Sequence, residues 1–344
     1  MKKKIFVAIL AVICIIISNL SVANTEASEL KKDNNNYIDE PYQYPVIPGT
    51  NEWKELDSMP QKIAVSHVKL ELLEKMTTSA LVETVVTYPL FICVHAYDSL
   101  ETGVTEVSTY FKGIEELCKR SDAREKVLQY INDRCPGLAE MKTEEEIGAS
   151  LSGYIKAYDE SGDREVFYID NAITLNDYIE SLCGKEEKLR YTSTYVYTPL
   201  NTAVSAVYGY TIYDHTTPTN AQIRNSNFKT SFPNAVELSS INPAYNCHSY
   251  AWHQQSTSNN YWIDYPAVNA YMTDGSYSSS NPAIGRRVVY KNSNGAAGHS
   301  GVISAITGTT YVTSKWEYCG LFYHTLTDCP YYSSCPNISY WKLN

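Results

Sequence analysis

The chemistry that this sequence offers centres on a cysteine in its C-terminal third. Cys247 lies in the segment YNCHSYAW, residues 245–252, directly after a polar loop that closes with Asn242-Pro243. This placement predicts a short helix from about residue 245 to 255, with Cys247 in its first turn. Unpaired backbone N–H groups and the positive end of the helix dipole lower the pKa of a thiol at such a position. Because a thiolate is a nucleophile, the position suits covalent catalysis.

A histidine downstream supplies the second part of a hydrolytic site. His299 lies in the segment GHSGVI, residues 298–303, where it opens a predicted strand after a turn that contains glycine. A histidine that faces a cysteine can take the thiol proton as a general base. The oxyanion of an acyl transfer would then be bound by the backbone N–H of Cys247 and by the side chain of Asn246. The predicted reaction is amide hydrolysis through a Cys247 thioester.

The order of these segments resembles the CHAP (cysteine, histidine-dependent amidohydrolase/peptidase) domains of the papain-like superfamily. Residues 246–252, which read NCHSYAW, look like the nucleophile motif of that family, and the strand GRRVVY at 285–290 precedes the Gly-His segment. The resemblance covers roughly residues 240–318 and looks like a divergent branch in secreted Gram-positive bacterial proteins. It implies a papain-like α+β fold with an antiparallel sheet, Cys247 as nucleophile and His299 as general base.

One position departs from the family pattern. Such domains carry an acid or an amide on the next strand to orient the imidazole, and here that stretch reads TSKW, residues 313–316. Lys315 falls roughly where the acid belongs, and a lysine cannot accept the imidazole N–H. We therefore take Ser314 as the candidate orienting residue. A backbone carbonyl, Glu317, or an aspartate such as Asp264 or Asp274 remains open as a substitute.

Each of these residues also has a purely structural interpretation. Cys247 can be a buried core thiol, and His248, which follows it on the helix, points away from it and suits packing. A zinc site formed by Cys247, His248 and His299 lacks the paired-ligand spacing typical of zinc proteins. The rival function is a non-catalytic secreted binding or adhesion module that retains a papain-like shell. Neither function implies a cofactor or a metal.

The elements that must position the site change character along the chain. From about residue 60 to 184 the apolar residues recur with helical spacing, which predicts an all-α array or bundle. After residue 189 the composition shifts to Tyr, Thr, Ser and Val. Strands are predicted at Tyr191–Tyr197 and Ala203–Tyr213 as a hairpin, and at Arg287–Tyr290, His299–Ala305 and Thr310–Trp316. The stretch between Thr216 and Pro243 reads as loop.

The N-terminus has the layout of an export signal. Three lysines, Lys2 to Lys4, precede an apolar run from Ile5 to Ile17 that is too short for a comfortable membrane span. The predicted organisation is therefore 1–23 signal peptide, 24–54 flexible linker, 55–186 helical domain and 190–344 α+β cysteine-hydrolase-like domain. We expect a secreted protein, extracellular or associated with the cell wall, without a transmembrane anchor.

Net charge and composition limit the classes of molecule that this protein is expected to bind. The net charge of −10 and the lack of a basic stripe argue against nucleic acid. An apolar fraction of 44% is ordinary for a globular protein, so a substantial core can form. The expected substrate is peptide-like: peptidoglycan, which the CHAP resemblance favours, or an extracellular protein. The sequence does not determine the oligomeric state.

Overall fold

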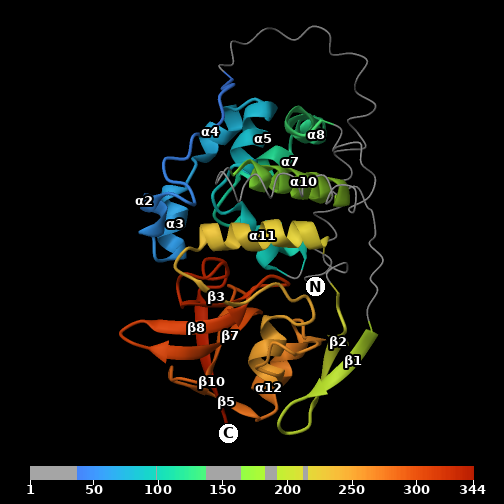
Figure 1. Ribbon diagram of the computed structural model, residues 1–344, viewed down its shortest axis with the longest axis vertical. Helices are drawn as coiled ribbons and strands as arrows, with labels where there is room; N and C mark the ends of the chain where they lie inside the picture. Colours follow the sequence, from blue (N-terminus) through green and yellow to red (C-terminus); the bar gives the residue numbers. More distant parts are fainter. Residues whose placement is uncertain (1–36, 98, 137–163, 183–191, 212–215) are drawn as a thin grey trace. The chain divides into compact units, whose positions relative to one another are not determined.

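The computed structural model describes residues 37–97, 99–136, 164–182, 192–211 and 216–344. Residues Ile38–Asn344 form one compact unit. Helices fill the N-terminal part of this unit and antiparallel sheets fill the C-terminal part, so the expected mixed α+β class is confirmed (Figure 1). The predicted signal peptide and the boundary near residue 186 lie outside the described residues. No helix in the described ranges is both long and apolar enough to cross a membrane.

The N-terminal part is built from short helices. They are α2 (Asn51–Lys54), α3 (Met59–Val65), α4 (Leu70–Lys75), α5 (Thr78–Val86), the 3₁₀ helix η1 (Phe91–Ala96), α6 (Leu100–Val107), α7 (Gly113–Cys118), α8 (Ala123–Arg134) and α10 (Glu165–Ser181). Threonine and serine begin several of them; Thr77, for example, accepts a hydrogen bond from the Ala80 N–H. Such N-caps satisfy backbone donors that helix geometry leaves unpaired.

The end of the predicted linker is structured. Residues 51–54 form α2, and Trp53 in this helix is fully buried. Its indole N–H donates a hydrogen bond to the Ser231 carbonyl at 2.9 Å. A large aromatic side chain that is buried with its polar atom paired anchors the backbone on which it stands. Residues 51–54 are therefore part of the folded unit.

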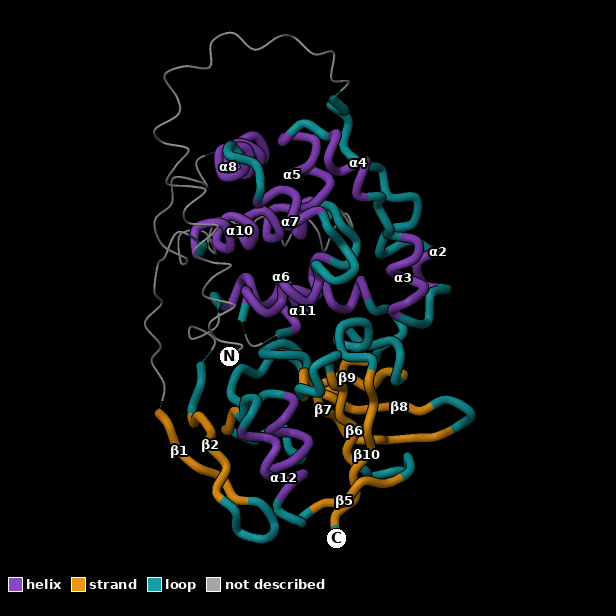
Figure 2. The backbone as a smooth tube through the Cα atoms, turned by 180° about the vertical axis from the view of Figure 1, so that it is seen from behind, coloured by secondary structure: helices purple, strands orange, loops and turns teal. Residues whose placement is uncertain are grey.

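The C-terminal part contains a seven-stranded antiparallel sheet in the order β3-β9-β8-β7-β6-β10-β5 (Figure 2). Its strands are β3 (Val236–Ser239), β5 (Tyr277–Ser280), β6 (Arg287–Lys291), β7 (Ala297–Ile306), β8 (Thr310–Lys315), β9 (Leu321–Thr325) and β10 (Asn337–Leu343). The three strands predicted in this region correspond to β6, β7 and β8. Gly295 and Gly308 have positive φ in the turns that join them, a conformation that suits glycine.

A smaller sheet has the order β1-β2-β4. It comprises β1 (Thr192–Tyr197), β2 (Ala203–Tyr208) and β4 (Tyr261–Trp262), and the first two form the predicted hairpin. One face of the hairpin buries Val196, Val204 and Ala206 in an apolar cluster that also contains Trp252 and Ile263. The opposite face is exposed.

The loop predicted between Thr216 and Pro243 is wrong for most of its length, because it contains the helix α11 and the strand β3. Residues Pro218–Ser231 form the helix α11, capped by Thr217 and started by a proline in its first turn. The helix was missed because its buried side is largely polar rather than apolar. These buried polar residues are Asn220, Arg224, Asn225, Asn227 and Ser231.

Arg224 is the centre of a buried polar network. Its guanidinium bonds Asp170 of α10 through two nitrogens, at 3.1 and 3.2 Å. It also donates to the Tyr318 hydroxyl at 2.9 Å and to the Thr216 hydroxyl at 3.1 Å. A buried bidentate pair with further hydrogen bonds has fixed geometry. The network therefore ties two helices to the turn that contains Tyr318, between β8 and β9.

Candidate functional site

Cys247 begins a short helical segment, as the sequence predicts. The chain is helical from residue 247 to 253 and takes π-helix geometry in η4 (Ser249–His253). Cys247 is 6% exposed and forms no disulfide. The helical segment is shorter than expected, so the field of its peptide dipoles at the thiol is limited. The electrostatics of the thiol then depend on nearby charged side chains.

One charged side chain whose pKa responds to a charge on Cys247 is Lys315, at the end of β8. Its side chain is fully buried, and its Nζ donates hydrogen bonds to the carbonyls of Glu317 and Cys319, each at 2.6 Å. The ammonium also lies 5.1 Å from the centre of the Tyr245 ring. Burial lowers the pKa of Lys315 to about 8, against the opposing effect of Cys319, Glu317 and Cys247. The amine therefore loses its proton more readily than an exposed lysine does, and a negative charge on Cys247 would raise its pKa.

The turn that holds Lys315 is unusual. Glu317, buried, has a φ of +48°, a conformation that is rare for a residue with a side chain. The Asn242 N–H donates to the Tyr318 carbonyl at 3.1 Å, and Asn225 accepts from the Gly320 N–H at 2.9 Å. Together with the Arg224 network, these bonds hold the carbonyls that receive the Lys315 protons. In the sequence, Lys315 stands out only as the residue at the expected acidic position.

The Asn246 side chain fixes the loop beside Cys247. Its side-chain carbonyl accepts from the N–H groups of Ser249 and Ile263, at 3.0 and 3.2 Å. Its amide nitrogen donates to the Ile263 carbonyl at 2.8 Å. The side chain thus binds both backbone groups of Ile263, the residue after β4. Its expected role as an oxyanion donor stays a prediction.

His299 lies on the other face of the sheet from Ser300, its neighbour in sequence. It pairs with Tyr290 across β6 and stacks on Tyr331, with ring centres 3.7 Å apart. The ring is fully buried, and neither of its nitrogens has a hydrogen-bond partner. Burial and the nearby His324 and His248 lower the pKa of His299 well below its usual value. No hydrogen bond therefore joins His299 to Cys247, and their pairing stays a prediction.

Ser314 contacts a different histidine from the one expected. Its hydroxyl lies 2.8 Å from His324 Nε2 and accepts a hydrogen bond from the Trp316 indole N–H at 3.2 Å. His324 Nδ1 lies 2.8 Å from the Thr325 carbonyl, which assigns the ring proton to Nδ1. Burial lowers the pKa of His324 to about 4. The Ser314 hydroxyl is thus used by Trp316 and His324, and orientation of His299 by Ser314 stays untested.

A similar arrangement lies on the opposite face. His248 Nδ1 lies 2.8 Å from the Ser300 hydroxyl, which accepts from the Trp252 indole N–H at 3.0 Å. The ring also donates to the Ala297 carbonyl, but burial dominates and lowers the pKa of His248 to about 4. His248 is therefore a buried, neutral packing residue. It and His299 lie on opposite faces of the sheet, so the two rings cannot share a zinc ion with Cys247.

The glycine of the Gly-His segment has a steric role. A Cβ atom on Gly298 would lie 2.5 Å from the Cys335 Sγ. Likewise, a Cβ atom on Gly301 would lie 2.4 Å from a methyl carbon of Val312. Close packing of these neighbours accounts for both glycines around His299 without reference to catalysis.

Comparison with protein-family models, with curated proteins and with solved structures finds no match to this chain. The resemblance to CHAP domains over residues 240–318 therefore depends on the residues that carry it. Among these, Cys247 has the expected position at a helix start.

Proposed function

We propose that this protein is an exported cysteine hydrolase that cleaves amide bonds in peptidoglycan or in an extracellular protein through a Cys247 thioester. The observation that supports it best is the fully buried Lys315 amine, whose Nζ is held by the Glu317 and Cys319 carbonyls and whose pKa a negative charge on Cys247 would raise. A buried amine with a pKa lowered to about 8 is unusual, and such groups cluster at functional sites.

The neutral Lys315 amine has a lone pair that can accept the proton of the Cys247 thiol. A neutral amine has two N–H groups and one lone pair, and in this site two carbonyls accept from Nζ. The lone pair is then left to take the Cys247 proton. The thiolate attacks the substrate carbonyl, the ammonium returns the proton to the leaving amine, and water hydrolyses the thioester.

His299 has a packing role in this proposal. Its ring is stacked on Tyr331 on the face away from Ser300, and both nitrogens are buried without partners. A Cys247–His299 pair would require the ring to leave this stack. The two alternatives differ in which variant, Lys315 or His299, removes the reactivity of Cys247.

We include in this proposal that the protein is exported and that it has more than one domain. It depends on the basic and apolar N-terminal residues and on the CHAP resemblance, which favours a papain-like C-terminal domain and peptidoglycan as substrate. Of the two substrate classes, neither has a binding residue assigned by the resemblance.

The test is hydrolysis by the purified chain. Dye-labelled peptidoglycan and casein are incubated with the protein, and the release of soluble dye and of new amino groups is measured. We expect release that Cys247→Ala abolishes and that Cys118→Ala, a control at a half-buried cysteine of α7, leaves intact. Release that survives Cys247→Ala, or no release from either substrate, would contradict the proposal.

A binding module is the second candidate. It is favoured by the burial of Cys247 and by a group of exposed tyrosines, Tyr195, Tyr197, Tyr208 and Tyr265, in the hairpin and in the segment after β4. Exposed aromatic side chains are typical of binding surfaces. In this case a Cys247→Ala variant would retain the full biological effect of the protein.

A further inference from the structure

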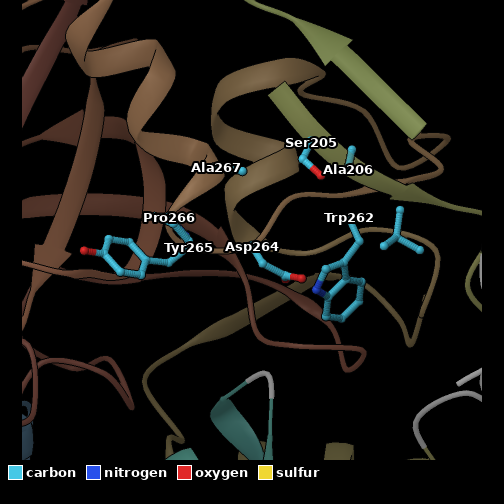
Figure 3. Close-up of a pocket in the computed structure, with 8 residues that line it drawn as sticks. Ser205, Ala206, Trp262, Asp264, Tyr265, Pro266 and Ala267 are labelled. Carbon is cyan, nitrogen blue, oxygen red and sulfur yellow. The ribbon is translucent and has the colours of Figure 1, made fainter. Parts of the chain in front are cut away.

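A pocket of about 360 Å³ opens beside the smaller sheet, and neither Cys247 nor Lys315 lines it. Figure 3 shows it between strand β2 and the segment that follows β4. Its lining residues are Ser205, Ala206, Val207, Trp262, Asp264, Tyr265, Pro266 and Ala267. The volume suits a side chain or a small organic group.

Asp264 is the chemically distinctive residue of this pocket. Its carboxylate lies beside the Trp262 indole nitrogen (Figure 3) and accepts a hydrogen bond from this side chain. Burial raises the pKa of Asp264, while the bond from Trp262 lowers it. Asp264 lies at the surface, where a ligand can reach it. It takes part in no ion pair among the described residues. A nearby cation would stabilise the charged form of such a partly desolvated carboxylate.

The surroundings of Asp264 carry no other charge in the chain segments that build the pocket. Residues 192–211 contain no charged side chain, and within residues 254–273 Asp264 stands alone. The whole chain is acidic, with a net charge of −10. Asp264 is therefore the charged residue of these two segments, and a carboxylate attracts cations and repels anions.

Aromatic rings complete the pocket. Tyr265 is 46% exposed at the pocket wall. Trp262 packs against Tyr210, with ring centres 5.2 Å apart. Rings and a carboxylate together attract an organic cation, since the ring face carries negative electrostatic potential and the carboxylate supplies the opposite charge.

The pocket is held rigidly. The two backbone groups of Ile263, between Trp262 and Asp264, are bonded to the Asn246 side chain. The Ile263 side chain is fully buried in the apolar cluster. The segment Trp262 to Asp264, at the end of β4 and just after it, is thus fixed to Asn246, the residue that precedes Cys247.

We propose that this pocket binds the ammonium group of a lysine side chain in a peptide ligand. The ammonium pairs with Asp264, and the aliphatic stem of the lysine packs on the rings and on the apolar lining. Binding requires neither the Cys247 thiol nor turnover, so this inference goes beyond the proposed function and does not depend on it. If the protein is a hydrolase, the pocket places a lysine-bearing peptide near Asn246.

The test uses the full chain and two short peptides, acetyl-Gly-Lys-Gly-amide and acetyl-Gly-norleucine-Gly-amide, which differ only in the terminal ammonium. Binding is followed by shifts of the tryptophan indole N–H signals in NMR. We expect the lysine peptide to bind at least tenfold more tightly than the norleucine peptide, with affinity that falls as salt is added. The variant Asp264→Asn is expected to remove this tenfold preference.

Two controls keep the outcome clear. Asp133→Asn on α8 makes the same charge change at an exposed residue outside the pocket and is expected to leave binding unchanged. Tyr265→Ala, at an exposed side chain, is expected to weaken the lysine peptide severalfold while the circular dichroism spectrum stays that of the parent. Equal binding of both peptides, no binding of either, an unaltered preference in Asp264→Asn, or binding of an N-acetylglucosamine trimer in place of the lysine peptide would overturn the proposal.

Discussion

The two faces of the seven-stranded sheet carry the same arrangement of three side chains, and one of these arrangements includes His248, the residue after Cys247. On the η4 face, Trp252 donates to Ser300, which is bonded to His248. On the α11 face, Trp316 contacts Phe228 of α11 and Phe232, the residue after this helix. Here Trp316 donates to Ser314, which is bonded in turn to His324. Both histidines are buried and have a pKa lowered to about 4.

The likeness of the two clusters teaches that a serine beside a histidine is structural in this sheet. Each serine satisfies one indole N–H and one imidazole nitrogen, which buried polar groups require. What distinguishes the η4 face is Lys315, a fully buried amine whose pKa a negative charge on Cys247 would raise. We therefore attribute function to the cysteine and the lysine, and packing to both serine–histidine pairs.

Removal of a tryptophan is the largest perturbation of either cluster. Trp316 is fully buried and contacts three phenylalanine rings, and Trp252 is 3% exposed. We expect Trp316→Ala to lower the free energy of unfolding by about 4–5 kcal/mol and Trp252→Ala by about 3–4 kcal/mol. Urea denaturation measures both. A larger loss in Trp252→Ala would show that the η4 face carries more of the stability than this comparison assigns to it.

The serines are expected to give equal, smaller effects. Ser300→Ala and Ser314→Ala each leave one indole N–H and one imidazole nitrogen unpaired, at a cost of about 1–3 kcal/mol of unfolding free energy. Neither variant should change the alkylation rate of Cys247 below its melting temperature. A Ser300→Ala protein of normal stability with unreactive Cys247 would break the comparison, because Ser300 would then have a functional role.

The dependence of stability on pH offers a further comparison of the two clusters. Burial lowers the pKa of His248 and His324 to about 4, whereas an unfolded histidine titrates near 6.5. Between these pH values only the unfolded chain binds the protons, so their contribution to stability is complete above pH about 6.5 and is lost as the pH falls towards 4. Each histidine contributes a slope of about 1.4 kcal/mol per pH unit.

The variants His248→Gln and His324→Gln should each reduce this slope by the same amount, as read from urea denaturation between pH 4.5 and 6.5. A reduction in one variant alone would mean that the two clusters differ in their protonation. His299, whose pKa is also lowered by burial, adds to the slope in all three proteins and so cancels in the comparison.

Local signals in the sequence were sufficient for the hairpin, for three strands of the larger sheet and for the position of Cys247, whereas β3, β4, β5, β9 and β10 were not predicted. The glycine turns and the apolar runs predicted β6, β7 and β8, and the polar loop before Cys247 predicted its place at a helix start. Helix α11 was missed because its buried side is polar, and apolar periodicity cannot reveal such a helix.

The partner of Cys247 could not be read from the sequence because strand side chains alternate between faces. A shift of one residue exchanges His299 for Ser300, and Ser314 for Lys315. From the sequence, Ser314 was predicted to orient the histidine, and Lys315 was interpreted as a departure from the family pattern at the expected acidic position. In the structure Ser314 lies beside His324, and Lys315 is a fully buried amine whose pKa a negative charge on Cys247 would raise.

The most direct test of this account is the pH dependence of Cys247 alkylation by iodoacetamide, read by peptide mass spectrometry. It is compared in the parent, in Lys315→Met and in His299→Phe, which keeps a ring to stack on Tyr331. The account predicts that the Lys315 variant shifts the midpoint of labelling upward by at least one pH unit, about tenfold in rate on the acid side, and that the His299 variant leaves the midpoint unchanged. A shift in His299→Phe with none in Lys315→Met would contradict it and restore the histidine as the partner of Cys247.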